Sequence, residues 1–152
     1  MRKRSGLIFR LLTLMVFSIS IFWFAVGCGT SFSSNGQRIY FTATSTSGQP
    51  ITYTGGPATM MQGRLACVNC HGPQGHGGTV AIMMQRVDVP NITWTQLTAP
   101  DADPQPYTEE TLKRAVTQGI DPAGNPLNYP MPRWQMSAQD VSDLVSFVKT
   151  LN

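Results

Sequence analysis

The stretch Cys67-Val68-Asn69-Cys70-His71 is the most informative part of this 152-residue chain. Two cysteines three positions apart lie on the same side of one helical turn, so both sulfur atoms can reach a single partner. The histidine follows at once, and its imidazole is a common metal ligand. The next residues, 72–78 (GPQGHGG), hold too much glycine for a regular helix or strand. Sulfur and imidazole are therefore presented together from one short turn that a loop ends.

The spacing C-x-x-C-H is that of c-type haem attachment, in which the cysteines form thioethers and the histidine ligates the iron. We therefore predict one covalently attached haem c on Cys67, Cys70 and His71. A thioredoxin-like dithiol would need an α/β pattern, of which the sequence has no sign. A zinc site would need His76 as well, with all four ligands crowded into ten residues. A plain disulfide between the two cysteines is the remaining alternative.

The first 27 residues have the pattern of an export signal. Four basic side chains in the first ten residues precede an apolar run, 11–26, that contains no charge. The small residues before Cys28 resemble the bacterial lipoprotein signal, in which that cysteine is lipidated and becomes the first residue of the mature chain. We expect a signal peptide over 1–27, lipid on Cys28 and a flexible tether over 28–35. An ordinary cleaved signal and an uncleaved anchor helix are the alternatives.

The positive charge of the chain belongs mostly to that signal. Eleven Lys and Arg stand against eight Asp and Glu, a net charge of +3, but without residues 1–27 seven basic side chains face eight acidic ones, a net charge of −1. The mature chain therefore has no excess of basic residues, and we expect no nucleic-acid partner. Its length suits one domain, and three cysteines are too few for a disulfide scaffold.

Three segments carry apolar residues at helical spacing. The first is 36–43, with Asn35 as its expected N-cap, and it is followed by a Ser/Thr/Gly-rich loop over 44–57 with room for a short hairpin. The second runs from an N-cap at Thr108 to Gly119. These features, with the helix described next, predict an all-α fold.

The third helix, 137–151, closes the chain. Ser137 fits its N-cap, and one apolar stripe along the helix faces the core, whereas Asp140 is expected to face away.

An iron held by His71 needs a ligand on its opposite face. His76 is only five residues away and would lie on the same side, so we expect it to face solvent. Methionine is the other common strong ligand. Met131 stands between two prolines, which favour extended backbone and can lay one sulfur over a haem face. Met136 is the second choice, because a contact at the start of the last helix already accounts for it.

These motifs resemble those of class I cytochromes c. Gly72 continues the attachment sequence as in that family, and residues 129–134 (YPMPRW), here called the methionine strap, resemble the family's axial-methionine segment. The resemblance covers residues 36–152. It implies a bundle of three to five short helices around one covalently bound haem. The segment 44–66 departs from the family, because it separates the first helix from the attachment motif like an insertion.

Further positions resemble family residues. Gly36 and Tyr40 match the glycine and aromatic by which the first helix crosses the last, with Phe147 as the aromatic partner. Pro90 resembles the residue whose carbonyl oxygen accepts a hydrogen bond from the ligand histidine. Three aromatic residues are expected to line the pocket or bind the haem propionates: Trp94, Tyr129 and Trp134.

The resemblance implies a mono-haem carrier that passes single electrons between respiratory proteins, with His71 and Met131 as axial ligands. Because both axial positions would be filled, we expect no enzyme activity. A cytochrome subunit of a membrane-associated oxidoreductase and a haem peroxidase are the alternatives. We expect the protein at the periplasmic, outer face of the cytoplasmic membrane, anchored by lipid; a soluble periplasmic or signal-anchored form is the alternative.

Overall fold

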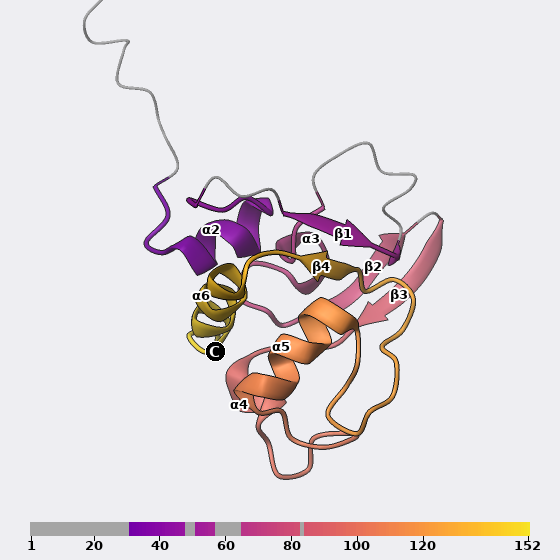
Figure 1. The fold of residues 1–152 in the computed structure, drawn as a ribbon. Coiled ribbons are helices and arrows are strands. Elements are labelled where there is room, and N and C mark those ends of the chain that lie inside the picture. The colour runs from indigo at the N-terminus through magenta and orange to yellow at the C-terminus, as the bar shows by residue number, and fades with distance from the viewer. Residues whose placement is uncertain (1–30, 48–50, 57–64, 83) are drawn as a thin grey trace, which may run out of the picture. The chain divides into compact units, whose positions relative to one another are not determined.

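Short helices and strands make up the structure, a computed structural model that describes residues 31–47, 51–56, 65–82 and 84–152 (Figure 1). The helices are α2 (Asn35–Thr42), α3 (Val68–His71), α4 (Trp94–Leu97), α5 (Glu109–Gln118) and α6 (Ala138–Val148). The strands are β1 (Thr52–Thr54), β2 (Gly78–Ile82), β3 (Gln85–Val89) and β4 (Arg133–Gln135). The described residues from Phe32 onward form one compact unit.

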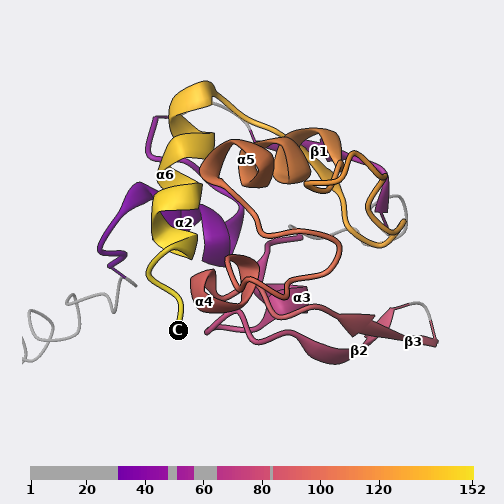
Figure 2. The same cartoon turned by 90° about the horizontal axis from the view of Figure 1, so that it is seen from below.

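Helices α2 and α6 cross in close contact, as both views of the ribbon show (Figures 1 and 2). A methyl group added to Gly36 would lie 1.9 Å from the carbonyl oxygen of Asp143, so only glycine lets the two backbones approach this closely. One turn further on, the ring centroids of Tyr40 and Phe147 are 5.3 Å apart. The predicted crossing of the first and last helices through these residues is therefore confirmed.

The start of α2 differs from the prediction by one residue. Ser34, not Asn35, is the N-cap, and its hydroxyl oxygen accepts a 3.1 Å hydrogen bond from the backbone N–H of Gln37. Asn35 instead donates its side-chain amide to Asp140 at 2.9 Å and to Asp143 at 2.7 Å. The N-cap prediction was wrong because those carboxylates come from the far end of the chain.

Helix α6 follows its prediction except at one side chain. Ser137 is the N-cap, and the whole predicted apolar stripe is buried: Val141, Leu144, Val145, Val148 and Leu151. Asp140, expected to face solvent, is 1% exposed. Asn35, Ser45 and Ser137 all donate hydrogen bonds to its carboxylate. The carboxylate can be buried with its charge because its oxygens accept hydrogen bonds from these three side chains.

Helix α5 forms as its sequence predicts. The Thr108 hydroxyl accepts from the backbone N–H of Thr111, and the Thr111 side chain accepts in return from the backbone N–H of Thr108, which completes a capping box. At the other end, Gly119 adopts the left-handed conformation with φ 69°.

Two antiparallel strand pairs add to the helices. Strands β2 and β3 form a hairpin in which Ile82 pairs with Gln85. Strand β1 pairs with β4, with Tyr53 opposite Trp134. The helices therefore agree with the expected all-α fold, but that fold class does not include these strands. The expected loop 44–57 contains β1, whose partner lies far along the chain and not in a local hairpin.

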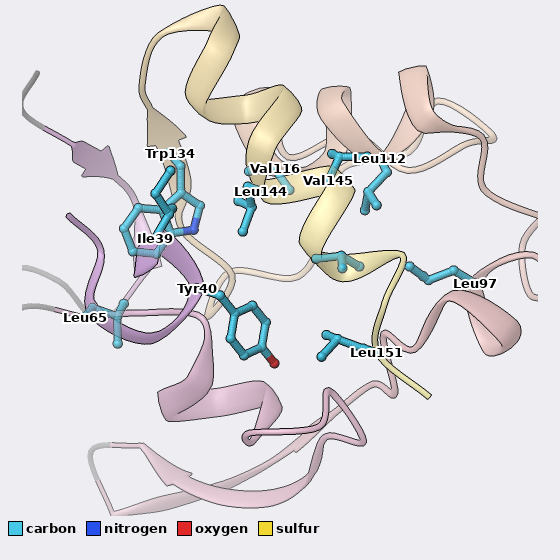
Figure 3. Packing of buried hydrophobic residues seen from close by; sticks show 11 residues of the cluster. Ile39, Tyr40, Leu65, Leu97, Leu112, Val116, Trp134, Leu144, Val145 and Leu151 are labelled. Carbon is cyan, nitrogen blue, oxygen red and sulfur yellow. The ribbon is translucent and has the colours of Figure 1, made fainter. Parts of the chain in front are cut away.

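The core gathers side chains from α2, α5, α6 and the segments around α3 and α4 (Figure 3). Its buried members are Ile39, Tyr40, Leu65, Leu97, Leu112, Val116, Trp134, Leu144, Val145, Val148 and Leu151. Tyr40 has no exposed surface, and its hydroxyl points out of the cluster toward the segment after α3 (Figure 3). The first helix therefore reaches the attachment motif through the core.

Several sequence predictions concern residues outside the described part of the chain. These are the signal peptide over 1–27, the lipidation of Cys28, the start of the tether 28–35 and much of the insertion 44–66. Among the described helices, none is both long and apolar enough to cross a membrane. The domain boundaries given above stay predictions.

Candidate functional site

Helix α3 holds the attachment motif in a single turn. The backbone N–H groups of Cys70 and His71 both donate to the carbonyl oxygen of Cys67, at 3.2 and 2.9 Å. The side-chain oxygen of Asn69 accepts from the backbone N–H of Ala66 at 2.7 Å and stabilises the entry to the turn. Both cysteines are partly exposed and unpaired, and they stand one helical turn apart, as predicted.

His71 lies at the inner end of this turn and is 6% exposed. Its Nδ1 is 3.2 Å from the carbonyl oxygen of Pro90. A carbonyl oxygen only accepts, so Nδ1 carries the proton and donates, and Nε2 keeps its lone pair. Burial lowers the pKa of His71, and the bond to Pro90 opposes this shift to a smaller degree. The ring is therefore neutral, fixed in orientation and ready to ligate a metal through Nε2.

The glycine-rich loop brings Pro90 to the histidine. The backbone N–H of Gly77 donates to the carbonyl oxygen of His71 at 2.9 Å. Gly77 has φ 68°, and a methyl group there would lie 2.2 Å from the carbonyl oxygen of Val89. Glycine is required here for both reasons. The backbone N–H of Ile92 donates to Gly75 at 2.7 Å and holds the other side of the Pro90 segment in place.

The two thiols do not have the properties of a redox dithiol or a zinc site. Burial raises the pKa of Cys67 to about 12 and also raises that of Cys70, whereas the reactive thiol of a redox dithiol has a lowered pKa. His76, the fourth ligand that zinc would need, is exposed. Within residues 31–47, 51–56, 65–82 and 84–152, no group of three His, Cys, Asp or Glu side chains could hold a metal ion.

The methionine strap lies against the same core as the attachment motif. Met131 is partly buried and packs on the core cluster, as does Cys67. The backbone N–H of Met131 donates to Asn128 at 3.1 Å, so the strap begins as a turn and not as the fully extended segment that two prolines suggested. Met136, the second choice, also packs on the core, immediately before the N-cap of α6. Met84, at the tip of the β2–β3 hairpin, is fully exposed.

The three aromatic residues expected in the pocket have different surroundings. Trp134 is 3% exposed, and its ring meets Tyr53 edge to face at 5.0 Å. Trp94 packs partly on the core, and the Lys149 ammonium lies 5.5 Å from its ring centroid. Tyr129 is 67% exposed, and its expected role at the pocket or the haem propionates stays a prediction.

The site as a whole fits covalent haem attachment. It offers two thiols on one side of a helical turn and, beside them, a buried neutral imidazole whose Nδ1 is already bonded. The cytochrome c family model matches residues 33–152. No curated protein and no solved structure matches the chain. The chain belongs to the cytochrome c family, and its cofactor is covalently bound haem c.

Three contacts at this site were not predicted from the sequence. The hydroxyl of Tyr40 donates to the carbonyl oxygen of Gly72 at 2.6 Å, although the sequence suggested only a packing role for that ring. Arg133 donates to the carbonyl oxygen of Met131. The pairing of β1 with β4 includes the last two residues of the strap, Arg133 and Trp134. The alternating Thr-Tyr-Thr of β1 was visible in the sequence, but its partner was not.

Proposed function

We propose that this cytochrome c carries single electrons between respiratory proteins, with its haem attached to Cys67 and Cys70 and its iron ligated by His71 and Met131. The observation that supports this most directly is the 3.2 Å bond between Nδ1 of His71 and Pro90, which leaves Nε2 as the free ligand atom of a buried ring. When bound, the haem supplies a one-electron couple between ferrous and ferric iron. A carrier needs little else from the protein than a fixed and shielded cofactor.

The residues around the motif meet that need by staying in place. The bond from Tyr40 to Gly72 and that from Gly77 to His71 hold the turn on either side of the histidine. Each contact uses a backbone carbonyl as acceptor, so a change of pH around neutrality leaves it intact. A rigid ligand turn lowers the reorganisation that accompanies a change of one charge.

Met131 is the ligand that this proposal assigns to the opposite face. Its thioether suits low-spin iron and raises the reduction potential relative to a second nitrogen ligand. Met131 packs on the core, and its backbone is held at both its N–H and its carbonyl oxygen. If His71 and Met131 both ligate the iron, substrates would have no access to it, which favours a carrier over a peroxidase.

We further propose that the protein works at the outer face of the cytoplasmic membrane, held by lipid on Cys28. The support is the amino-terminal sequence, in which a basic start, an apolar run and small residues precede that cysteine. Attachment of haem c takes place outside the cytoplasm in bacteria, so the signal and the attachment motif agree. A free carrier and a subunit of a membrane-associated oxidoreductase would share all these features and differ in their partners.

Visible spectra of the holoprotein test the ligand assignment. We expect reduced c-type bands and, in the ferric protein, a methionine-to-iron band at the red end of the spectrum. Met131→Ala should abolish that band and lower the reduction potential by at least about 59 mV, a tenfold change in a one-electron equilibrium. Met136→Ala is the matched control and should keep the band. A band that survives in Met131→Ala would make the assignment wrong.

Carbon monoxide tests the closed iron. The ferrous holoprotein should react slowly or not at all, because Met131 must leave before the gas can bind. Rapid binding by the wild-type protein would contradict a carrier with two protein ligands and would favour a peroxidase.

A further inference from the structure

The segment 52–56 and the methionine strap lie side by side, although the two are distant in sequence. Strand β1 pairs with β4 in the register Thr52–Gln135, Tyr53–Trp134 and Thr54–Arg133. Strand β4 begins two residues after Met131, so this pairing holds the carboxyl-terminal end of the strap. The rings of Tyr53 and Trp134 reinforce it with an edge-to-face contact of 5.0 Å. Residues 52–56 of the insertion are therefore packed on the proposed ligand segment.

Gly56 brings this contact to the residues on either side of Met131. It is buried, has φ +67°, and a methyl group there would lie 3.1 Å from the carbonyl oxygen of Pro130 and 3.4 Å from Cα of Pro132. The backbone of Gly56 thus packs against both prolines that flank the methionine. Its neighbour Gly55 is exposed with φ +70°, and a methyl group there would only make an ordinary 3.9 Å contact with the Arg133 side chain.

Arg133 holds the strap through hydrogen bonds. One guanidinium nitrogen donates to the carbonyl oxygen of Met131, and another donates to that of Leu127 at 2.9 Å. The guanidinium lies directly over Gly119 at the end of α5, where a methyl group would come within 2.1 Å of Nε. The planar group with its several donors can bridge two carbonyl oxygens at once, which the single ammonium of lysine cannot do as well.

We propose that strand β1, the backbone of Gly56 and the guanidinium of Arg133 are positioning elements that keep the Met131 sulfur at the iron. This inference rests on the proposed function, because it takes Met131 as the axial ligand. A thioether is a neutral and modest ligand, so its hold on the iron depends on how closely the backbone keeps it in place. Strand β1 restrains the strap at Arg133 and Trp134, and Gly56 restrains it at Pro130 and Pro132. Arg133 restrains the carbonyl of Met131 itself. In this proposal, part of the insertion 44–66 has a function at the haem site, because it positions the methionine ligand.

Exogenous imidazole measures this restraint, because it competes with Met131 for ferric iron. Gly56→Ala pushes a methyl group against Pro130 and Pro132, and it should raise the affinity of the ferric holoprotein for imidazole about tenfold. Gly55→Ala is the matched control, since it places alanine at nearly the same positive φ in the same turn without pressing on the strap. It should leave the imidazole affinity within about twofold of the wild type.

Arg133→Gln and Arg133→Lys test the second element. The glutamine variant loses the two-carbonyl bridge and should also bind imidazole about tenfold more tightly, with the lysine variant in between. Thermal loss of the methionine-to-iron band should precede loss of far-ultraviolet circular dichroism in Gly56→Ala and Arg133→Gln, whereas the two should coincide in Gly55→Ala. If the methionine-to-iron band and the circular dichroism are instead lost together in every variant, the role of these residues is purely structural and the proposal is overturned.

The outcomes separate this proposal from the ligand assignment. If Met131→Ala keeps the band, the ligand assignment is wrong, and there is no bond between Met131 and the iron for these elements to maintain. If Met131→Ala loses the band while Gly56→Ala and Arg133→Gln bind imidazole like the wild type, only the positioning role is wrong. If Gly56→Ala does not fold, Arg133→Gln alone decides, because it adds no atom to the packed turn.

Discussion

The hydroxyl of Tyr40 donates a 2.6 Å hydrogen bond to the carbonyl oxygen of Gly72, the residue that directly follows His71, the proposed haem ligand. Tyr40 is fully buried in α2, and its ring also contacts Phe147 of α6. Burial raises the pKa of the Tyr40 phenol, so the hydroxyl stays protonated and remains a donor. One side chain thus connects the crossing of the first and last helices to the haem attachment turn.

Tyr40→Phe should therefore lower the free energy of unfolding by about 1 kcal/mol, the usual worth of one hydrogen bond with a neutral acceptor. Denaturant titration of the holoprotein, followed by circular dichroism, measures this loss. Tyr129→Phe is the control, because that ring is 67% exposed, and it should change the value by less than about 0.5 kcal/mol. Equal losses in the two variants would contradict a role for the Gly72 contact.

Asp140→Asn should destabilise the protein in a pH-dependent way. Burial tends to raise the pKa of Asp140, but hydrogen bonds from Ser45, Asn35 and Ser137 outweigh it and lower the pKa below its usual value of 3.8. A lowered pKa in the folded state means that the carboxylate stabilises the fold above about pH 4, and that this stabilisation disappears as the pH falls through the folded-state pKa.

The difference between wild type and Asp140→Asn should accordingly be about 2 kcal/mol at pH 7 and should shrink as the pH falls below about 4. Denaturant titrations of both proteins across this range measure it. The same substitution at the exposed Asp101 serves as control and should give a difference near zero throughout. A difference at Asp140 that stays constant with pH would show that shape and not charge is responsible.

Cys67→Ser and Cys70→Ser should each leave one thioether, and the double variant should hold no covalent haem. Haem staining after a denaturing gel and the intact mass of the exported chain report this directly. Cys28→Ser, which lies outside the attachment motif, should keep the full haem mass. Haem that stays covalently bound in the double variant would place the attachment elsewhere.

Cys28→Ser should release the protein from the membrane fraction, because lipid on that residue is the proposed anchor. Mass spectrometry of the wild-type amino terminus should find an acylated cysteine as the first residue. Cys70→Ser is the matched control and should stay with the membrane. A mature chain that still begins with residues 1–27 would instead indicate an uncleaved signal anchor.

Local sequence patterns predicted the parts of this protein that depend on neighbours in the chain. The attachment turn, the caps of α5 and α6 and the buried stripe of α6 all follow from residues three or four positions apart. The contact of His71 with Pro90 was also expected, from the family resemblance. Each of these features uses side chains or backbone groups whose relation the helical period or a known motif already defines.

Long-range contacts account for the errors. Asn35 donates hydrogen bonds to two carboxylates of α6 instead of capping α2. The same contact between the first and last helices buries Asp140. Strand β1 was predicted as loop or local hairpin, because its partner β4 follows only after the attachment motif and two further helices. Hydrogen bonds across such distances in sequence leave no periodic trace in either segment.

The cofactor chemistry follows from the order of the residues alone, because C-x-x-C-H places its three groups within a single helical turn. The way in which the site is held depends on contacts between segments that are far apart in the chain. Folding brings the Tyr40 hydroxyl to Gly72, packs Gly56 against the methionine strap and places the Arg133 guanidinium on the Met131 carbonyl oxygen. The physical reason is that a covalent motif is local, whereas the rigidity of a ligand comes from backbone carbonyls and glycines that meet only when the whole chain has folded.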